Sequence, residues 1–254
     1  MLTVQNLSFR YPGRDMQALR GVSFSLQPGE IAGVLGKNGA GKTTLFHCLL
    51  GQLKPQGGQI LLHQSPLSAI SRRERAKAIA YVPQEVRFGG MSVYDSVLMG
   101  RIASFGLRRS EEDHAAVERV LRDMGLEVLA SRNAEELSGG EKKKIAIARA
   151  LAQEPRMLLL DEPTASLDMA NEQMILREVK RLAAQQGIAV LAALHDLNQA
   201  LWLCTRLVLI REGQVAYDVK KKDLTPRMIR DVFGVDVQLL KLQGTTYVIG
   251  GGTP

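Results

Sequence analysis

The chain has 254 residues, with 33 Lys plus Arg against 26 Asp plus Glu, and a formal net charge of +7. Hydrophobic residues make up 45% and charged residues 23%, which excludes disordered, collagen-like and disulfide-scaffold proteins. The length suits one large domain, or a core domain with one inserted subdomain. No apolar run approaches the roughly 18 residues that a membrane-spanning helix needs, and the first five residues lack the basic and apolar regions of a secretion signal. We therefore expect a cytosolic protein.

The basic residues gather in short clusters at 72–77, 142–144 and 220–222, without interleaved aromatic residues. Aromatic residues make up only 5% of the chain, so a stacking platform for single strands is not expected, and we predict no nucleic-acid partner. The two cysteines, Cys48 and Cys204, each lie beside a leucine and far apart in sequence. This setting predicts buried free thiols.

The predicted elements alternate between strands and helices, which indicates a mainly parallel sheet with right-handed crossovers. The hydropathy pattern of the sequence changes over 86–151. Apolar residues such as Val117, Leu121 and Met124 recur there at helical spacing, so we predict a helical insertion. The predicted strands are 2–10, 18–26, 31–35, 59–62, 79–82, 157–160, 188–193 and 207–211; the predicted helices are 42–50, 171–186, 197–203 and 225–233; a hairpin follows over 238–249.

A glycine-rich loop between a predicted strand and a predicted helix carries the first chemical motif. Residues 36–43, GKNGAGKT, fit the pattern G-x-x-x-x-G-K-[ST] in the context that this pattern requires. The glycines let backbone N–H groups point inward at phosphate oxygens, and the following helix adds its positive end. We expect Lys42 to reach the β- and γ-phosphates, Thr43 to ligate Mg²⁺ and Thr44 to contact the α-phosphate. The loop alone predicts a nucleoside triphosphate ligand.

Two carboxylates, Asp161 and Glu162, follow the apolar run 157–160. They lie at the carboxyl end of a predicted buried strand, where open α/β sheets bind ligands. We expect Asp161 to hold Mg²⁺, directly or through water, and Glu162 to orient and partly deprotonate the water that attacks the γ-phosphate. In isolation the pair could also be a solvated acidic turn, but the phosphate loop favours the catalytic interpretation.

Residues 137–141, LSGGE, precede a further predicted helix. Ser138 is a candidate N-cap, and the double glycine, which a simple cap does not require, allows an anion to approach closely. With the phosphate loop before it and the acidic strand after it, this segment resembles the ATP-binding subunit of ABC transporters, over nearly the whole chain. The resemblance implies an α/β fold: a P-loop NTPase core, with a mainly parallel sheet and an antiparallel β subdomain, plus an inserted helical subdomain.

The same resemblance implies a single ABC cassette. Residues 1–85 and 155–254 would form a RecA-like ATP-binding core, with an N-terminal β subdomain and a C-terminal tail, and residues 86–154 a helical signature subdomain. Two copies would pair head to tail, so that each ATP lies between the phosphate loop of one and Ser138 with Gly140 of the other. Closure would pull on transmembrane permease subunits held in a groove near Gln84 and residues 86–101. An extracytoplasmic substrate-binding protein would complete the complex at the cytoplasmic face of the membrane.

The family's functional residues can be placed one by one. Tyr11 resembles the aromatic residue that stacks on adenine, and Gln84 resembles the Q-loop glutamine that contacts Mg²⁺ and the attacking water. Residues 165–168 resemble the D-loop, and His195 resembles the switch histidine that contacts the γ-phosphate. The resemblance thus implies Glu162, His195 and Gln84 as catalytic residues and Thr43, Gln84 and Asp161 as Mg²⁺ ligands. The implied ATP-binding residues are Tyr11, Gly36, Asn38, Gly39, Gly41, Lys42, Thr43, Thr44, Ser138, Gly139, Gly140 and Asp168.

One departure from the family follows Gly139 and Gly140, which we call the signature glycines. Where the family usually has Q-x-Q-R, residues 141–144 read EKKK, and lysine in place of arginine loses the planar fork of the guanidinium. We interpret Lys142, Lys143 and Lys144 as a solvated helix face, with a basic patch facing phosphate or lipid as the alternative.

Within the family, residues 99–101 (MGR), the spacing from there to Arg132 and the signature, and the tail 225–235 resemble the importers of iron-siderophores, haem and cobalamin. That group commonly has proline where Ile102 and Ala103 stand and His-Gln where Asn171-Glu172-Gln173 stand. Other metal, oxyanion and vitamin importers therefore stay open. A soluble ABC ATPase that acts as an assembly factor, as in iron–sulfur cluster biogenesis, is the alternative function. DNA-repair and translation cassettes are disfavoured, because long coiled-coil insertions and a second cassette are absent from the sequence.

Overall fold

The computed structural model describes residues 1–105, 109–165 and 167–250, which form two compact units. Unit 1 contains Met1–Ile70 and the residues from Ala189 onward, and unit 2 contains Ser71–Ile188. Ser166, within the segment expected as the D-loop, lies outside the described residues. Among the described helices, none has the length and apolar character needed to cross a membrane.

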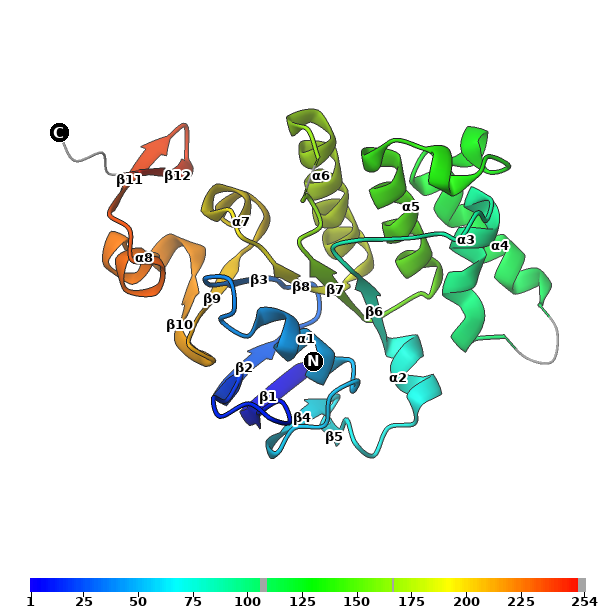
Figure 1. Cartoon of the computed structure of the whole chain (residues 1–254). Coiled ribbons are helices and arrows are strands. Elements are labelled where there is room, and N and C mark those ends of the chain that lie inside the picture. Colours follow the sequence, from blue (N-terminus) through cyan, green and yellow to red (C-terminus); the bar gives the residue numbers. More distant parts are fainter. Residues whose placement is uncertain (106–108, 166, 251–254) are drawn as a thin grey trace. The chain divides into compact units, whose positions relative to one another are not determined.

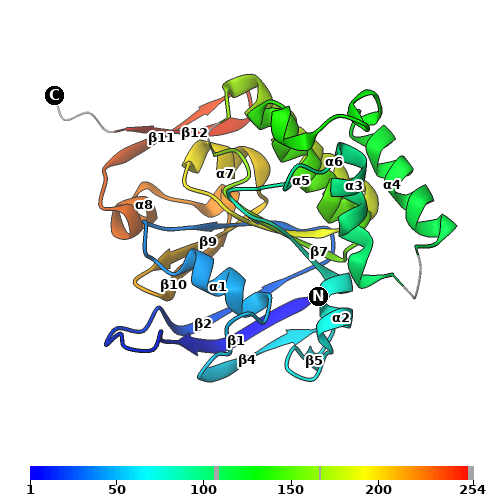
Figure 2. The ribbon, with the colours of Figure 1, turned by 45° about the vertical axis from the view of Figure 1, so that its right-hand side comes forward.

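Unit 1 contains an antiparallel sheet, a group of mainly parallel strands and a terminal hairpin (Figure 1). The antiparallel sheet has the order β2-β1-β4-β5; β3 pairs in parallel with β8 and β9, and β10 is antiparallel to β9. Helix α1 lies between these two groups of strands in Figures 1 and 2. The elements are β1 (Leu2–Phe9), β2 (Leu19–Leu26), β3 (Ile31–Leu35), α1 (Lys42–Leu49), β4 (Gly57–Leu62), β5 (Ser65–Pro66), β8 (Ala189–Ala193), α7 (Leu197–Leu203), β9 (Arg206–Arg211), β10 (Gln214–Lys220), α8 (Pro226–Phe233), β11 (Val237–Leu242) and β12 (Thr245–Gly250).

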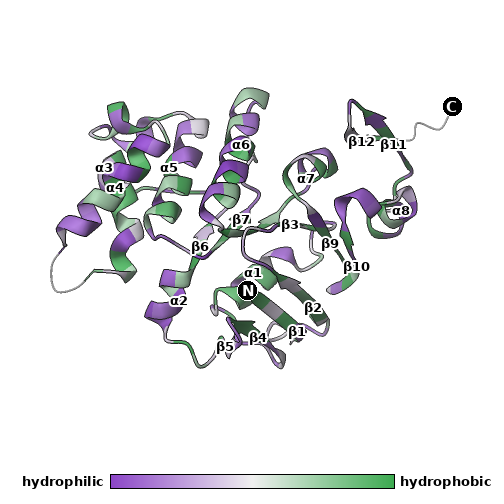
Figure 3. Cartoon of the chain, turned by 180° about the vertical axis from the view of Figure 1, so that it is seen from behind, coloured by the Kyte–Doolittle hydropathy of each residue, from purple (hydrophilic) through white to green (hydrophobic). Residues whose placement is uncertain are grey.

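Unit 2 contains a parallel strand pair and a group of helices. Strands β6 and β7 pair in parallel, and α3 packs against both α4 and α5. In Figure 3 the strands are mostly hydrophobic, α2 is mostly hydrophilic, and α4 mixes hydrophilic and hydrophobic residues along its length. The elements are α2 (Arg72–Ala78), β6 (Ile79–Val82), α3 (Val93–Leu98), α4 (Glu111–Asp123), α5 (Gly139–Ala152), β7 (Met157–Asp161) and α6 (Met169–Gln186), with 3₁₀ turns at Met99–Ala103, Glu127–Leu129 and Ala134–Glu136.

The buried strands end at the predicted motifs. All residues of β3, β7 and β8 are buried, as expected for parallel strands that are covered on both faces. The phosphate loop follows β3, Glu162 follows β7, and Leu194 and His195 follow β8. The predicted α/β class, with parallel strands, an antiparallel sheet and a helical segment, is therefore confirmed.

Three elements were missed by the sequence prediction: β5, α2 and β10. The basic cluster at 72–77 forms α2, which buries none of its residues, so no apolar periodicity marks it. Its signal was the capping box, in which Ser71 accepts from the Glu74 N–H while the Glu74 carboxylate accepts from the Ser71 N–H. The prediction of buried free thiols is confirmed for both cysteines, and burial raises the pKa of Cys48 to about 11.

A buried arginine ties the helices of unit 2 together. The side chain of Arg101, in the MGR segment, donates to Asp113 (3.0 Å), to Glu154 (2.7 Å) and to the Ala152 carbonyl (3.0 Å). Arg101 is 5% exposed and Asp113 is 3% exposed. The Ser110 backbone N–H and the Arg101 guanidinium both bind the Asp113 carboxylate, and together with the Ser110 hydroxyl they lower its pKa. Arg101 therefore links the 3₁₀ turn after α3 to the start of α4 and the end of α5.

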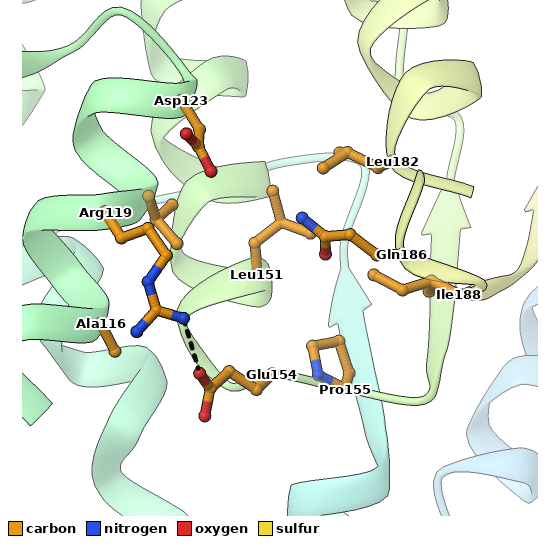
Figure 4. Close-up of a pocket in the computed structure, with 10 residues that line it drawn as sticks. Ala116, Arg119, Asp123, Leu151, Glu154, Pro155, Leu182, Gln186 and Ile188 are labelled. Carbon is orange, nitrogen blue, oxygen red and sulfur yellow. Dashed lines mark hydrogen bonds and ion pairs between the residues drawn. The ribbon is translucent and has the colours of Figure 1, made fainter. Parts of the chain in front are cut away.

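Glu154 also marks the edge of a pocket between α4, α5 and α6 (Figure 4). Its other carboxylate oxygen pairs with Arg119 at 3.4 Å, and this pair is exposed to solvent. The pocket has a volume of about 390 Å³ and is lined by Ala116, Arg119, Val120, Asp123, Leu151, Glu154, Pro155, Leu182, Gln186 and Ile188. None of the nucleotide motifs contributes a residue to this lining.

Replacing Arg101 should be far more costly than replacing Arg119. Arg101→Met leaves the buried Asp113 carboxylate without its cation, which we expect to lower the free energy of unfolding by about 3–5 kcal/mol. Arg119→Met removes only an exposed pair and should cost about 0–1 kcal/mol. Denaturant titration of both variants measures the difference. Equal losses would show that the Arg101 pair does not hold the helices together.

Candidate functional site

The phosphate loop of unit 1 needs glycine because backbone atoms crowd it. A Cβ added to Gly36 would lie 2.3 Å from the Ile210 carbonyl oxygen, and one added to Gly41 would lie 2.6 Å from the Ala18 carbonyl oxygen. Gly41 also has a φ of 107°, in the region that side chains rarely adopt. The close contact of these glycines with neighbouring strands fixes the path of the loop between β3 and α1.

Lys42, the first residue of α1, is buried and turns back into this loop. Its Nζ donates to the carbonyl oxygens of Gly36 (2.7 Å) and Lys37 (3.3 Å). Lys42 is only 7% exposed, whereas Lys37, Asn38 and Gly39 at the loop tip are exposed. A positive charge held inside the loop, next to the exposed residues of the loop tip, suits the binding of phosphate oxygens.

Tyr11 is brought to the same helix. Its hydroxyl lies 3.2 Å from Thr44 Oγ1, and its ring packs edge-on against Phe9 with centroids 4.9 Å apart. Tyr11 remains 41% exposed, so it can offer a ring face to a ligand. Thr43 is exposed and Thr44 is buried. Unit 1 thus gathers Tyr11, Lys42 and Thr44 around the start of α1.

His195 is exposed at the end of the buried strand β8. The next residue, Asp196, caps α7 by accepting from the Gln199 N–H at 2.9 Å. The cap fixes the chain direction immediately after His195, so the histidine is held at the strand end by its neighbour.

In unit 2, Asp161 is the last residue of β7 and is 7% exposed. The Tyr81 hydroxyl of β6 donates to Asp161 Oδ2 at 3.3 Å. Burial raises the pKa of Tyr81, and the Asp161 charge raises it further, so the phenol stays a donor. Sequence reasoning missed Tyr81, because nothing distinguishes a tyrosine in a short strand from a packing residue.

Glu162 and Gln84 are in direct contact, as expected if they serve one reaction. Gln84 Nε2 donates to Glu162 Oε2 at 2.9 Å. Glu162 has a φ of 46°, a left-handed conformation that costs about 1–3 kcal/mol for a residue with a side chain and is concentrated at functional sites. The strained backbone and the amide contact together orient the carboxylate at the end of β7.

The interpretation of the three lysines as a solvated face is wrong for Lys143. This residue is 5% exposed, and its Nζ donates to the carbonyl oxygens of Pro83 (3.2 Å) and Gln84 (2.9 Å). Burial lowers the pKa of Lys143, while the charges of Asp161 and Glu162 act to raise it. The pattern misled because one position of the lysine run faces inward on α5, and a run of three like residues hides that periodicity.

Ser138 caps α5, as the sequence predicted. Its hydroxyl accepts from the Glu141 N–H (3.3 Å), while the Glu141 carboxylate accepts from the Ser138 N–H (2.9 Å), so the two form a capping box. The hydrogen bonds from Ser138 lower the pKa of Glu141. Ser138 and Gly139 are exposed, and this end of α5 presents backbone N–H groups suited to an anion.

Asn171 connects the segment around Asp168 to the signature glycines, a role that the sequence did not reveal. Asp168 caps α6 by accepting from both the backbone N–H and the side-chain amide of Asn171, each at 2.8 Å, and the first of these most strongly lowers the Asp168 pKa. A Cβ on Gly140 would lie 2.3 Å from Asn171 Oδ1, whereas one on Gly139 would meet only Leu167 at an ordinary 3.7 Å. A side chain at residue 140 would therefore displace the Asn171 amide from its bonds with Asp168, whereas one at residue 139 would not.

Comparison with known proteins agrees with these motifs. A family model described as ABC transporter matches residues 19–165. A hemin import ATP-binding protein of Deinococcus radiodurans is 41% identical over 243 residues, covering 93% of this chain and 91% of that protein. A phosphonates import ATP-binding protein of Rhodopseudomonas palustris is 36% identical over 244 residues, covering 92% of this chain and 87% of that protein.

Solved structures show the same fold. One is described as a metal-chelate type ABC transporter in an inward-facing conformation, with a TM-score of 0.85, 31% identity, and coverage of 97% of this chain and 95% of that chain. A bacterial ABC transporter cassette solved as a dimer has a TM-score of 0.77, 26% identity, and coverage of 88% and 100%. Because the family model spans more than half of the chain and the relatives match nearly all of it, this chain belongs to the ABC transporter family, as one of its ATP-hydrolysing subunits.

Proposed function

We propose that this chain binds and hydrolyses ATP to power an importer. The observation that carries the proposal is the phosphate loop, in which glycines crowded by backbone and the buried Lys42 Nζ form a cradle suited to phosphate oxygens. Gly36, Asn38, Gly39 and Gly41 would bind through their backbone, with Thr43 and Thr44 at the helix start, and Tyr11 would stack on the adenine.

The proposed Mg²⁺ ligands fit that ion by their chemistry. Thr43, Gln84 and Asp161 offer hydroxyl, amide and carboxylate oxygens, and magnesium prefers such hard ligands with several waters. When bound, the ion would neutralise phosphate charge.

Glu162 is the proposed general base. Its carboxylate, held by the Gln84 amide, would accept a proton from the water that attacks the γ-phosphorus as the bond to ADP breaks. His195 would donate to the γ-phosphate, and Lys42 would stabilise its charge as inorganic phosphate forms. These roles divide the reaction between a fixed phosphate cradle and an oriented water.

We further propose that two copies close head to tail around ATP. Ser138, Gly139 and Gly140, with Asp168, would contact the nucleotide bound to the other copy, and loss of phosphate would release the closed state. The dimeric cassette among the similar structures supports this arrangement. In this proposal residues 86–154 form the helical signature subdomain, and residues 1–85 and 155–254 form the core.

The proposed cargo is a metal chelate, such as an iron-siderophore, haem or cobalamin. The hemin import relative and the metal-chelate type structure support this class, and the phosphonate relative names the competing one. The chain would act at the cytoplasmic face of the membrane, bound to permease subunits that work with an extracytoplasmic substrate-binding protein.

Extraction of the tagged chain from membranes tests the transport role. A multi-span membrane protein is expected to co-purify in detergent, because the proposed role requires permease subunits that bind this chain. Recovery with soluble scaffold proteins alone would instead support an assembly factor. The control is the same extraction carried out without the permease on a chain that carries an unrelated tag. It identifies proteins that adhere to the resin itself.

Glu162→Gln should separate binding from turnover. The phosphate cradle is unchanged, so ATP affinity should stay within about twofold, whereas loss of the base should lower kcat by about 10²-fold or more. Fluorescent-nucleotide titration and phosphate release measure the two quantities. Glu111→Gln, on the exposed side of α4, is the matched control and should behave as the unchanged protein. Turnover near the normal rate in Glu162→Gln would remove Glu162 from the base role.

A further inference from the structure

The segment that contains Gln84 is attached to helix α5 through the first residues of the segment. We call residues 83–89 the Q-loop segment. At its start, Lys143 of α5 donates to two successive carbonyls, those of Pro83 and Gln84. Both carbonyls follow the last residue of β6, where strand pairing ends, so they need donors from elsewhere. Lys143 supplies both from a single side chain.

The other end of the Q-loop segment is also held. Phe88 is 1% exposed, and its backbone N–H, with that of Gly89, donates to the Glu135 carboxylate. Arg149 of α5 lies over the Phe88 ring, with its guanidinium carbon 5.4 Å from the centroid. The middle residues, 85–87, are not buried. The segment is thus fixed at two points, of which the first carries the functional glutamine.

Lys142, the first lysine of the run, supports the far end of the Q-loop segment only indirectly. Lys142 Nζ lies 3.5 Å from Glu135, and both side chains are about one-third exposed. An exposed pair of this kind contributes little, on the order of 0–1 kcal/mol. Lys143 differs, because a buried ammonium group is costly unless its donors are satisfied. The position of Lys143 therefore depends on the Pro83 and Gln84 carbonyls, and their position depends on Lys143.

We propose that Lys143 is a positioning residue for ATP hydrolysis, which holds the Gln84 backbone against α5 so that the Gln84 amide stays on Glu162. The inference rests on the proposed function, since Lys143 acts through Gln84. The departure from the family pattern at residue 143 then has a structural consequence. Lys143 attaches the Q-loop segment to α5, the helix that Ser138 caps. A displacement of Pro83 and Gln84 is passed along one helix to the signature serine.

Lys143→Met, which removes the donor at similar length, tests the proposal in the full chain. Amide hydrogen exchange at Phe88 and Gly89, whose N–H groups bind the Glu135 carboxylate, should become at least about tenfold faster, because the Q-loop segment is then held at one end only. The kcat for ATP should fall about tenfold, with the KM for ATP within twofold, because a misplaced catalytic group costs rate while the phosphate cradle is intact. Lys144→Met, on the same helix and only half-buried, is the matched control and should change neither quantity.

Gln84→Ala distinguishes failure of this inference from failure of the proposed function. If Gln84→Ala hydrolyses ATP at the normal rate, the proposed role of Gln84 is wrong, and the catalytic role of Lys143 with it. If Gln84→Ala is slow while Lys143→Met retains normal exchange or normal kcat, the inference about Lys143 alone is overturned. Should Lys143→Met fail to fold, Lys143→Gln keeps one amide donor and should show smaller changes in the same direction. Unchanged exchange in that variant would also overturn the inference.

Discussion

Two buried lysines hold the backbone of the two loops on which the proposed chemistry depends. Lys42 donates to the carbonyls of Gly36 and Lys37 in unit 1, and Lys143 donates to those of Pro83 and Gln84 in unit 2. In each case the chain has just left a strand, so its carbonyls have lost their strand partners, and a desolvated ammonium group needs acceptors. One interaction satisfies both requirements. It gives each loop a fixed shape before any ligand arrives.

Fixed loops allow side chains to be held where charge develops during a reaction. The Gln84 amide binds the Glu162 carboxylate, while the left-handed backbone at Glu162 turns that carboxylate away from the strand path. In the same way, helix caps fix the ends at which ligands are proposed to bind: Ser138 with Glu141 begins α5, and Asp168 with Asn171 begins α6. The capped N-termini of α5 and α6 are thus suited to binding phosphate.

The sequence predicted the parts of the site in which local chemistry restricts the residue type. Gly36 and Gly41 are recognisable because no side chain fits beside the Ile210 and Ala18 carbonyls. The strand before Asp161 is recognisable because burial on both faces leaves a continuous apolar run. Tyr81, Asn171 and Arg101 carry no such local signal, since their roles arise from contacts with distant segments.

The lysine run shows why the remaining features escaped prediction. Lys142 and Lys143 are neighbours in sequence, yet one pairs with an exposed carboxylate and the other is buried against a loop 59 residues away. The charge pattern along one helix predicts which side chains face solvent. It does not predict which distant residues an inward-facing side chain contacts, because the fold determines those contacts. The identity of the cargo cannot be read from these residues, because the roles proposed for them all concern a nucleotide.

We propose that ATP joins two copies of this chain through α5, the helix that Ser138 caps. The most direct test is the mass of Glu162→Gln in solution with Mg²⁺ and ATP, determined by sedimentation equilibrium. We expect a species of two chains that returns to one chain when ATP is replaced by ADP. Adding Ser138→Arg should prevent its formation, whereas adding Ser71→Arg, which disrupts a similar cap on α2, should not. A species of one chain at every nucleotide concentration would contradict the account.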